Sequence, residues 1–150
     1  MNIIFYCAGK NGYYDNLSLL IKRCPQRKRI EIYSDIEALS HKIKQSYRDK
    51  TVAVICAETF EDLIDIYLIK HLFYGIAFIL ILPDNEKDTL AMGSLLRPLF
   101  TFSINSNISD IYAALQRLIA RECFDNNKNH STCRKENQAR SSLKPLLRAA

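Results

Sequence analysis

The sequence lacks an apolar run long enough to cross a membrane. The most apolar stretch, residues 63–82, contains an acid, a lysine and a histidine and is broken at Gly75. The run after Gly75 falls far short of the roughly 20 residues that a membrane helix needs. The opening MNIIFYCAGK also has no basic segment before its apolar residues, as a secretory signal would have. We therefore expect a cytoplasmic protein that does not enter a membrane.

Close cysteine pairs are missing as well. The five cysteines form an odd set, Cys7, Cys24, Cys56, Cys123 and Cys133. Cys7 and Cys56 fall in predicted core strands, where a free thiol behaves as a small apolar side chain. This usage is typical of a reducing compartment and argues against a fold held together by disulfides.

Excess charge is nearly absent from most of the chain, although the net charge is +5. Six of the 21 basic and two of the 16 acidic residues lie in residues 125–150, which carry +4, so the preceding 124 residues carry +1. The polar, unperiodic text after Phe124 predicts a disordered basic tail over 125–150, beside one domain over 1–124. Since the tail has no aromatic residue for base stacking, any nucleic-acid contact would be nonspecific and salt-dependent.

Five short apolar runs alternate with five helix-like stretches. The runs cover residues 2–7, 29–33, 51–56, 76–82 and 99–104. The third and fourth are apolar at nearly every position, as in strands that are buried on both faces of a parallel sheet. The alternation predicts a three-layer α/β/α fold, with a flavodoxin-like five-stranded parallel sheet of order 2-1-3-4-5.

Capping patterns mark helix starts after three of the runs. Residues 34–37 (SDIE) have the form of a capping box, in which Ser34 and Glu37 satisfy free amides of the first turn. Residues 59–62 (TFED) repeat the pattern, and residues 107–110 (NISD) follow the last run. Three helices are therefore expected to begin at these points.

Recognisable catalytic motifs are missing from the loops at the carboxyl ends of the strands, where this fold keeps its ligands. Residues 8–15 (AGKNGYYD) match neither a P-loop nor a dinucleotide fingerprint, and they contain no Ser or Thr for a flavin phosphate. No cysteine of the predicted domain has the Arg six positions later that a phosphatase nucleophile needs. The polar residues left as candidates for a ligand crevice are Lys10, Asn11, Glu58 and Asp84. A small-molecule binder of the flavodoxin-like class is therefore one alternative.

The arrangement resembles the receiver domains of bacterial response regulators over about residues 1–122. The stretches that carry the resemblance are VAVICAETFEDL, IAFILILPDNEKDT and LRPLFTFSINSNISDIYAAL. The resemblance implies an acidic pair after strand one, a phosphoacceptor Asp ending strand three, a Ser or Thr ending strand four and a Lys ending strand five. The acids would bind Mg²⁺ and the Lys would neutralise the phosphoryl group.

The matching places in this chain hold other residues, namely Ala8 and Gly9, Cys56 and Ala57, Leu82 and Pro83, and Ser103 to Asn105. Glu58 and Asp84 come one or two positions late, where an acid ordinarily caps a helix. We therefore predict a degenerate receiver that keeps the fold, is not phosphorylated, is not an enzyme, and has no metal or cofactor.

The resemblance also implies a partner surface, formed by helix four, strand five and helix five. The candidates are Leu95, Leu96, Pro98, Phe100 and Tyr112. Such residues can equally belong to the core, so a partner surface requires an exposed apolar patch. The predicted function is a noncatalytic protein-interaction module in bacterial signalling, with a homodimer as one form.

Two further alternatives remain open. Residues 5–16 (FYCAGKNGYYDN) are similar to the phosphocysteine loop of sugar-phosphotransferase B subunits, which would make Cys7 a phosphate carrier, although the hydroxyls of that loop are missing. Cys123, His130 and Cys133 could contribute to a zinc site, but a fourth ligand is not apparent. A core thiol and an unfolded tail are the simpler interpretations.

Overall fold

The structure is a computed structural model. It describes residues 1–8, 15, 19, 22, 29–45 and 50–124. The chain divides into two units, residues 1–118 and 119–150, and the first unit contains the sheet. The predicted basic tail lies outside the described residues.

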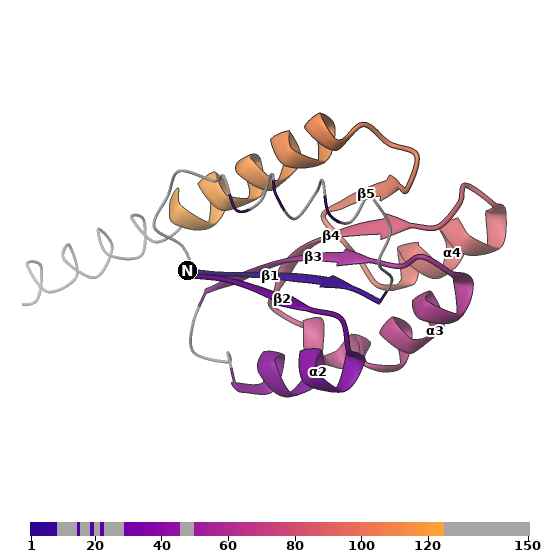
Figure 1. Ribbon diagram of the computed structural model, residues 1–150, viewed down its shortest axis with the longest axis horizontal. Helices are drawn as coiled ribbons and strands as arrows, with labels where there is room; N and C mark the ends of the chain where they lie inside the picture. The colour runs from indigo at the N-terminus through magenta and orange to yellow at the C-terminus, as the bar shows by residue number, and fades with distance from the viewer. Residues whose placement is uncertain (9–14, 16–18, 20–21, 23–28, 46–49, 125–150) are drawn as a thin grey trace, which may run out of the picture. The chain divides into compact units, whose positions relative to one another are not determined.

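A five-stranded parallel sheet forms the centre of the first unit (Figure 1). Its strands are β1 (Asn2–Cys7), β2 (Arg29–Tyr33), β3 (Thr51–Cys56), β4 (Ala77–Leu82) and β5 (Phe100–Ser103). Their order is β2-β1-β3-β4-β5, and every neighbouring pair is parallel. The predicted fold class and strand order are therefore confirmed. The strands β4 and β5 are slightly shorter than the apolar runs, residues 76–82 and 99–104, that predicted them.

Helices cover both faces of the sheet, as parallel crossovers require. One face carries α2 (Ile36–Gln45), α3 (Phe60–Leu68), a short 3₁₀ helix η1 (Lys70–Phe73) and α4 (Lys87–Leu95). The opposite face carries residues 108–118, the part within the first unit of a helix that begins at residue 108 (Figure 1). No helix among the described residues is long and apolar enough to span a bilayer.

The core is continuous through the inner strands. Every residue of β1 and β3 is buried, because these strands are covered on both faces. On the face of α2 and α3 the largest fully buried side chains include Leu39, Leu63 and Ile66. On the other face Ile111, Leu115 and Leu118 are buried at the three- and four-residue steps of one helical stripe.

Side chains cap the starts of α2 and α3, with one departure from the expected residues, whereas the N-cap residue of α4, Glu86, makes no side-chain cap bond. At α3, Thr59 Oγ1 accepts a hydrogen bond from Asp62 N (3.1 Å), while Asp62 Oδ2 accepts one from Thr59 N (3.2 Å), so the predicted capping box is present. At α2, Asp35 Oδ1 accepts from Glu37 N (3.4 Å) and the carbonyl of Asp35 accepts from Leu39 N. The capping position therefore belongs to Asp35, one residue later than the predicted Ser34.

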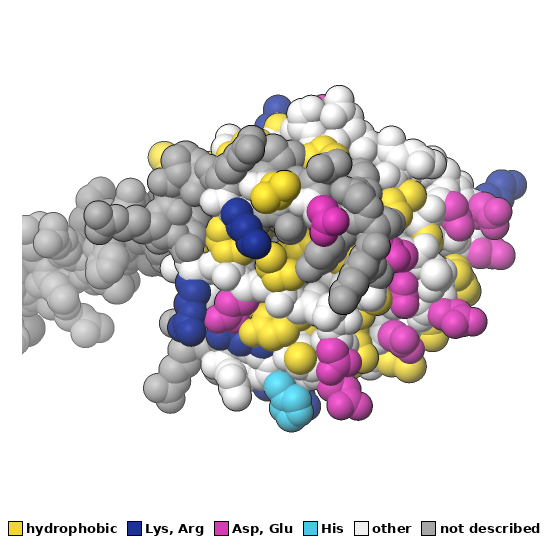
Figure 2. Space-filling view, viewed as in Figure 1, with side chains coloured by type: hydrophobic (Ala, Val, Ile, Leu, Met, Phe, Trp, Pro, Cys, Tyr) yellow, Lys and Arg dark blue, Asp and Glu magenta, His cyan; other side chains and the backbone are white. Residues whose placement is uncertain are grey.

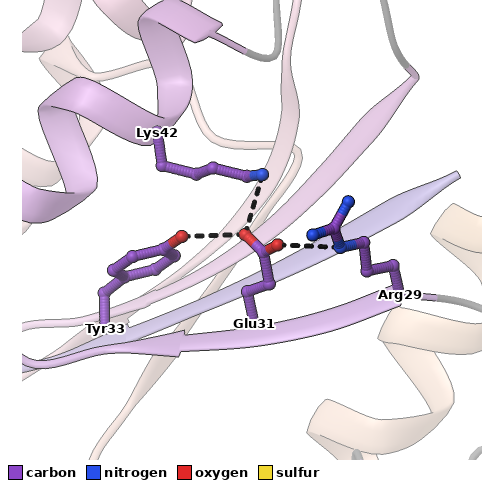
Figure 3. Close-up of polar contacts among 4 residues, drawn as sticks. All are labelled: Arg29, Glu31, Tyr33 and Lys42. Atoms are coloured by element: carbon purple, nitrogen blue, oxygen red, sulfur yellow. Dashed lines mark hydrogen bonds and ion pairs between the residues drawn. The ribbon is translucent and has the colours of Figure 1, made fainter.

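A polar cluster fastens α2 to the edge strand β2 (Figure 3). The carboxylate of Glu31 accepts from Tyr33 Oη (2.8 Å) and pairs with Lys42 Nζ and Arg29 Nε, both at 3.0 Å. Burial alone would raise the pKa of Glu31, but the bonds from Tyr33 and Lys42 and the two positive charges outweigh it and lower that pKa. The pKa of Tyr33 is raised to about 12, by burial first and then by its bond to Glu31. The cluster thus joins a strand to a helix through one partly buried carboxylate.

Candidate functional site at the carboxyl edge of the sheet

Two buried cysteines end the central strands. Cys7 closes β1 and Cys56 closes β3, and the two are opposite each other in the register of that strand pair. Both are free thiols, 1% and 2% exposed respectively. This edge is where the predicted crevice and the predicted phosphorylation positions would lie.

The thiols are tied to each other and to the first carboxylate beyond β3. Cys7 Sγ donates to Glu58 Oε1 at 3.6 Å, within hydrogen-bond range for sulfur. The hydrogen bond with Cys7 and burial raise the pKa of the Cys56 thiol far above its ordinary value, and the charge of Glu58 acts in the same direction. Cys56 is therefore held as a neutral thiol, which is a poor nucleophile.

Glu58 is itself part of the local backbone structure. Its amide donates to Asp62 Oδ2 at 3.3 Å, the same oxygen that closes the capping box of α3. The side chain of Glu58 is half-buried beside the strand ends. This carboxylate thus lies at the predicted edge, next to a thiol and a helix start.

Acidic residues gather around this edge in the first turns of the helices, although the strand ends themselves hold none. Figure 2 shows Asp and Glu side chains gathered on the side where α3 and α4 begin. The first turns of α2, α3 and α4 contain Glu37, Glu61, Asp62 and Asp88. Negative side chains at helix starts are favourable because they oppose the helix dipole. Within the described ranges, no group of three or more His, Cys, Asp or Glu side chains is placed to hold a metal ion.

Asp84 follows β4 and has the role of a turn residue. Its Oδ1 accepts from Glu86 N at 3.0 Å, just before α4 begins. This bond is the local side-chain-to-backbone contact that Asp commonly makes in turns. Of the four predicted crevice residues, Glu58 and Asp84 are both half-buried at this edge, while Lys10 and Asn11 lie outside the described residues.

The end of β5 carries hydroxyl groups. Ser103 N donates to Ser106 Oγ at 3.1 Å, and the two hydroxyl oxygens are 3.4 Å apart. Ile104 N donates to Leu82 O at 2.8 Å, which extends the pairing of β4 and β5 by one bond. The last strand therefore ends in a closed turn.

Solved structures of three bacterial proteins are similar to this chain, although no protein-family model and no curated protein matches it. A response regulator receiver protein from Pseudoalteromonas atlantica has a TM-score of 0.62 at 12% identity, with 81% of this chain and 99% of that chain covered. The chain has the receiver fold. At this level of identity the likeness establishes the fold alone.

The other two structures are proteins assigned to pilus assembly in Burkholderia. The one from B. pseudomallei has a TM-score of 0.59 at 16% identity and covers 80% of this chain and 90% of its own. The CpaE protein from B. thailandensis has a TM-score of 0.58 at 15% identity, with 80% and 98% covered. Both share the receiver fold with this chain.

The ends of β3 and β4 hold other residues than the phosphorylation residues that the receiver resemblance implies. Cys56 and Ala57, 2% and 0% exposed, occupy the end of β3, and Ala57 N donates to Ile81 O at 2.9 Å. Leu82, 1% exposed, ends β4. These positions therefore form a buried, largely apolar floor rather than a set of oxygen ligands.

The predicted partner surface is only partly exposed. Leu95 is 57% exposed, and Pro98, Phe100 and Tyr112 are half-buried. Leu96 is 6% exposed and packs in the core with the α2 and α3 residues, so the structure places it inside the molecule. The sequence did not single out Leu99, which is 44% exposed and immediately precedes β5.

The predicted phosphocysteine residue is buried, whereas the described one of the three predicted zinc residues is exposed. Cys7 is buried, so its sulfur does not face solvent as a phosphate carrier's would. Cys123 is exposed, while His130 and Cys133 lie outside the described residues. Nothing among the described residues brings ligands to Cys123.

Proposed function

We propose that this chain is a receiver-like protein-interaction module that works without phosphorylation. The observation that carries the proposal is the end of β3. A receiver keeps its phosphoacceptor there, and this chain has the buried pair Cys56 and Ala57. The next carboxylate, Glu58, is engaged by Cys7 Sγ. An aspartyl phosphate needs an accessible carboxylate with further oxygen ligands for a metal beside it, and the end of β3 has a buried thiol and a buried methyl group instead.

The surface that we propose for the partner lies around β5. β5 is an edge strand, with Thr101 exposed and Phe100 half-buried. Leu99, which immediately precedes β5, and Leu95, which ends α4, are exposed apolar side chains. An edge strand beside exposed apolar side chains is a natural place for another chain to bind. The proposed partner is a second copy of this chain.

The setting we propose is bacterial signalling. Its support is the shared fold with a response regulator receiver protein and with two proteins assigned to pilus assembly. A module without phosphorylation would act through binding alone. Because two of the similar structures are proteins assigned to pilus assembly, we propose pilus assembly as the first process in which to test for a binding partner.

Light scattering across a concentration series tests the proposed surface. We expect a dimer that Leu99→Asp dissociates, because a charge would be buried in an apolar contact. Leu68→Asp is the matched control, since Leu68 is 67% exposed at the end of α3, away from β5. A wild-type chain that stays monomeric, or a dimer that is indifferent to Leu99→Asp, contradicts the proposed homodimer.

A further inference from the structure

A cavity of about 550 Å³ opens at the edge of the sheet opposite to the strand ends discussed above. Its walls come from η1 and the turn that leads into β4, and from the last residues of α4 and the turn after it. The size is within the range of about 300–1,000 Å³ typical of small-molecule sites. All of its lining residues are described, and all belong to the first unit.

The inner wall of the cavity is apolar and aromatic. Phe73, Phe78 and Leu96 are buried in the core cluster and also line the cavity. The rings of Phe73 and Phe78 are in contact, with centroids 5.1 Å apart. Tyr74 also lines the cavity, and its side chain is 94% exposed. A solvent-exposed aromatic ring beside an aromatic floor suits a flat apolar group.

The ionisable side chains that line the cavity are all basic or neutral. Lys70, His71 and Arg97 contribute, and the lining contains no Asp or Glu. Lys70 Nζ is steadied by Tyr67, lying 3.3 Å from its Oη and 4.5 Å from its ring centroid. At the end of α4 the carbonyls of Gly93 and Ser94 accept hydrogen bonds from Leu96 N and Arg97 N. The cavity is therefore positive and apolar together.

Arg97 adopts a backbone conformation that does not suit its residue type. Its φ is 54°, the only positive φ of a non-glycine residue in the described part of the chain. At this position, just past the end of α4, glycine is the usual choice because it has no Cβ to strain. The fold alone therefore does not explain an arginine here. Arg97 lines the cavity, and a guanidinium offers the fork that recognises carboxylate, sulfonate or phosphate.

We propose that this cavity is a binding site for a small organic anion with an aromatic body. The ring would lie against Tyr74 and the Phe73–Phe78 pair, and the anionic group would pair with Arg97 and Lys70. The site is separate from the carboxyl edge, and Leu95 belongs both to its lining and to the partner surface proposed above.

Two fluorescent probes with the same aromatic body test the proposal. Anilinonaphthalene sulfonate carries an anionic group, and phenylnaphthylamine lacks it. We expect the sulfonate to bind the full-length protein at one site, and the neutral probe to bind at least about tenfold more weakly, since a charge-assisted hydrogen bond is lost. Arg97→Gly should weaken sulfonate binding about tenfold for the same reason and leave the neutral probe unchanged.

The Arg97→Gly variant is informative because it should fold at least as well as the wild type, its strain being relieved. Lys44→Ala is the matched control, because it removes one exposed positive charge on α2, outside the cavity. Sulfonate affinity that follows Arg97→Gly but not Lys44→Ala supports the site. Equal binding of the two probes, binding at several sites, or equal effects of the two substitutions overturns it.

Discussion

Cys7 and Cys56 stand opposite each other at the ends of β1 and β3, and Cys7 Sγ donates to Glu58. In the receiver fold this is the point at which a carboxylate would accept phosphate. Here two buried thiols end the central strands, and the carboxylate of Glu58 is hydrogen-bonded to one of them. This contact supports our proposal that the chain acts without phosphorylation, although many acids surround this edge.

Thiol reactivity provides the first prediction. In the native protein, alkylation should modify the exposed Cys123 rapidly and leave Cys7 and Cys56 unmodified, because both are buried and Cys56 has a raised pKa. Peptide mass spectrometry after brief iodoacetamide treatment would assign the sites. Denaturant should expose both thiols. Rapid native labelling of Cys7 would instead favour a phosphocysteine carrier.

The capping box of α3 provides the second prediction. Thr59→Ala removes the acceptor for Asp62 N and should lower the free energy of unfolding by about 1 kcal/mol. Thr59→Ser keeps the hydroxyl and should restore most of the loss. Urea unfolding measures both variants. Equal stability of Thr59→Ala and the wild type would show that this cap contributes nothing.

The strand order and the cap of α3 could be predicted from the sequence, whereas the exact start of α2 could not. The strand order and the α3 cap follow from local signals: apolar runs of strand length, and a Thr followed three residues later by Asp. The start of α2 was misplaced by one residue because Ser34 and Asp35 are both good capping residues and the pattern does not choose between them.

The features that could not be predicted from the sequence are contacts between residues of different helices and strands. Glu31 meets Lys42 only once β2 and α2 are packed together, so neither residue signals the pair. The cavity near Arg97 forms only when η1 and the end of α4, which are separated in the sequence by β4, come together. Its one local feature, the positive φ of Arg97, is not visible in the sequence. Burial of Leu96 beside exposed Leu95 likewise reflects where α4 ends.

The Glu31 cluster predicts acid sensitivity. The pKa of Glu31 is lowered in the folded state, so its stabilisation is complete above the ordinary value of 4.5 and is lost as pH falls through the lower folded value. Lys42→Met should cost about 1–2 kcal/mol at neutral pH, because it breaks a partly buried pair. It should also flatten the fall of stability below pH 4.5.

Urea unfolding across an acid pH series measures both effects of Lys42→Met. Lys44→Met is the control, because Lys44 is an exposed lysine on the same helix. Identical acid profiles for Lys42→Met and the wild type would show that the pair does not govern this titration.

The raised pKa of Tyr33 predicts that the folded state loses stability at alkaline pH. Its pKa is raised from 10.0 to about 12, so the folded state favours the neutral phenol. The resulting stabilisation is present below pH 10 and is lost as pH rises toward 12. Tyr33→Phe should cost about 1 kcal/mol at neutral pH and show a shallower alkaline decline. Thermal unfolding at increasing pH follows both, and an unchanged alkaline slope would contradict the assignment.

Incubation with a small phosphodonor shows whether the carboxyl edge of this sheet can be phosphorylated. The full-length protein is incubated with acetyl phosphate and Mg²⁺, and intact mass and phosphopeptides are measured, with an active receiver domain treated in parallel. We expect no added phosphate on this chain, while the active receiver is modified. A phosphoryl group on Glu58, Asp84 or any other carboxylate at the carboxyl edge would contradict it.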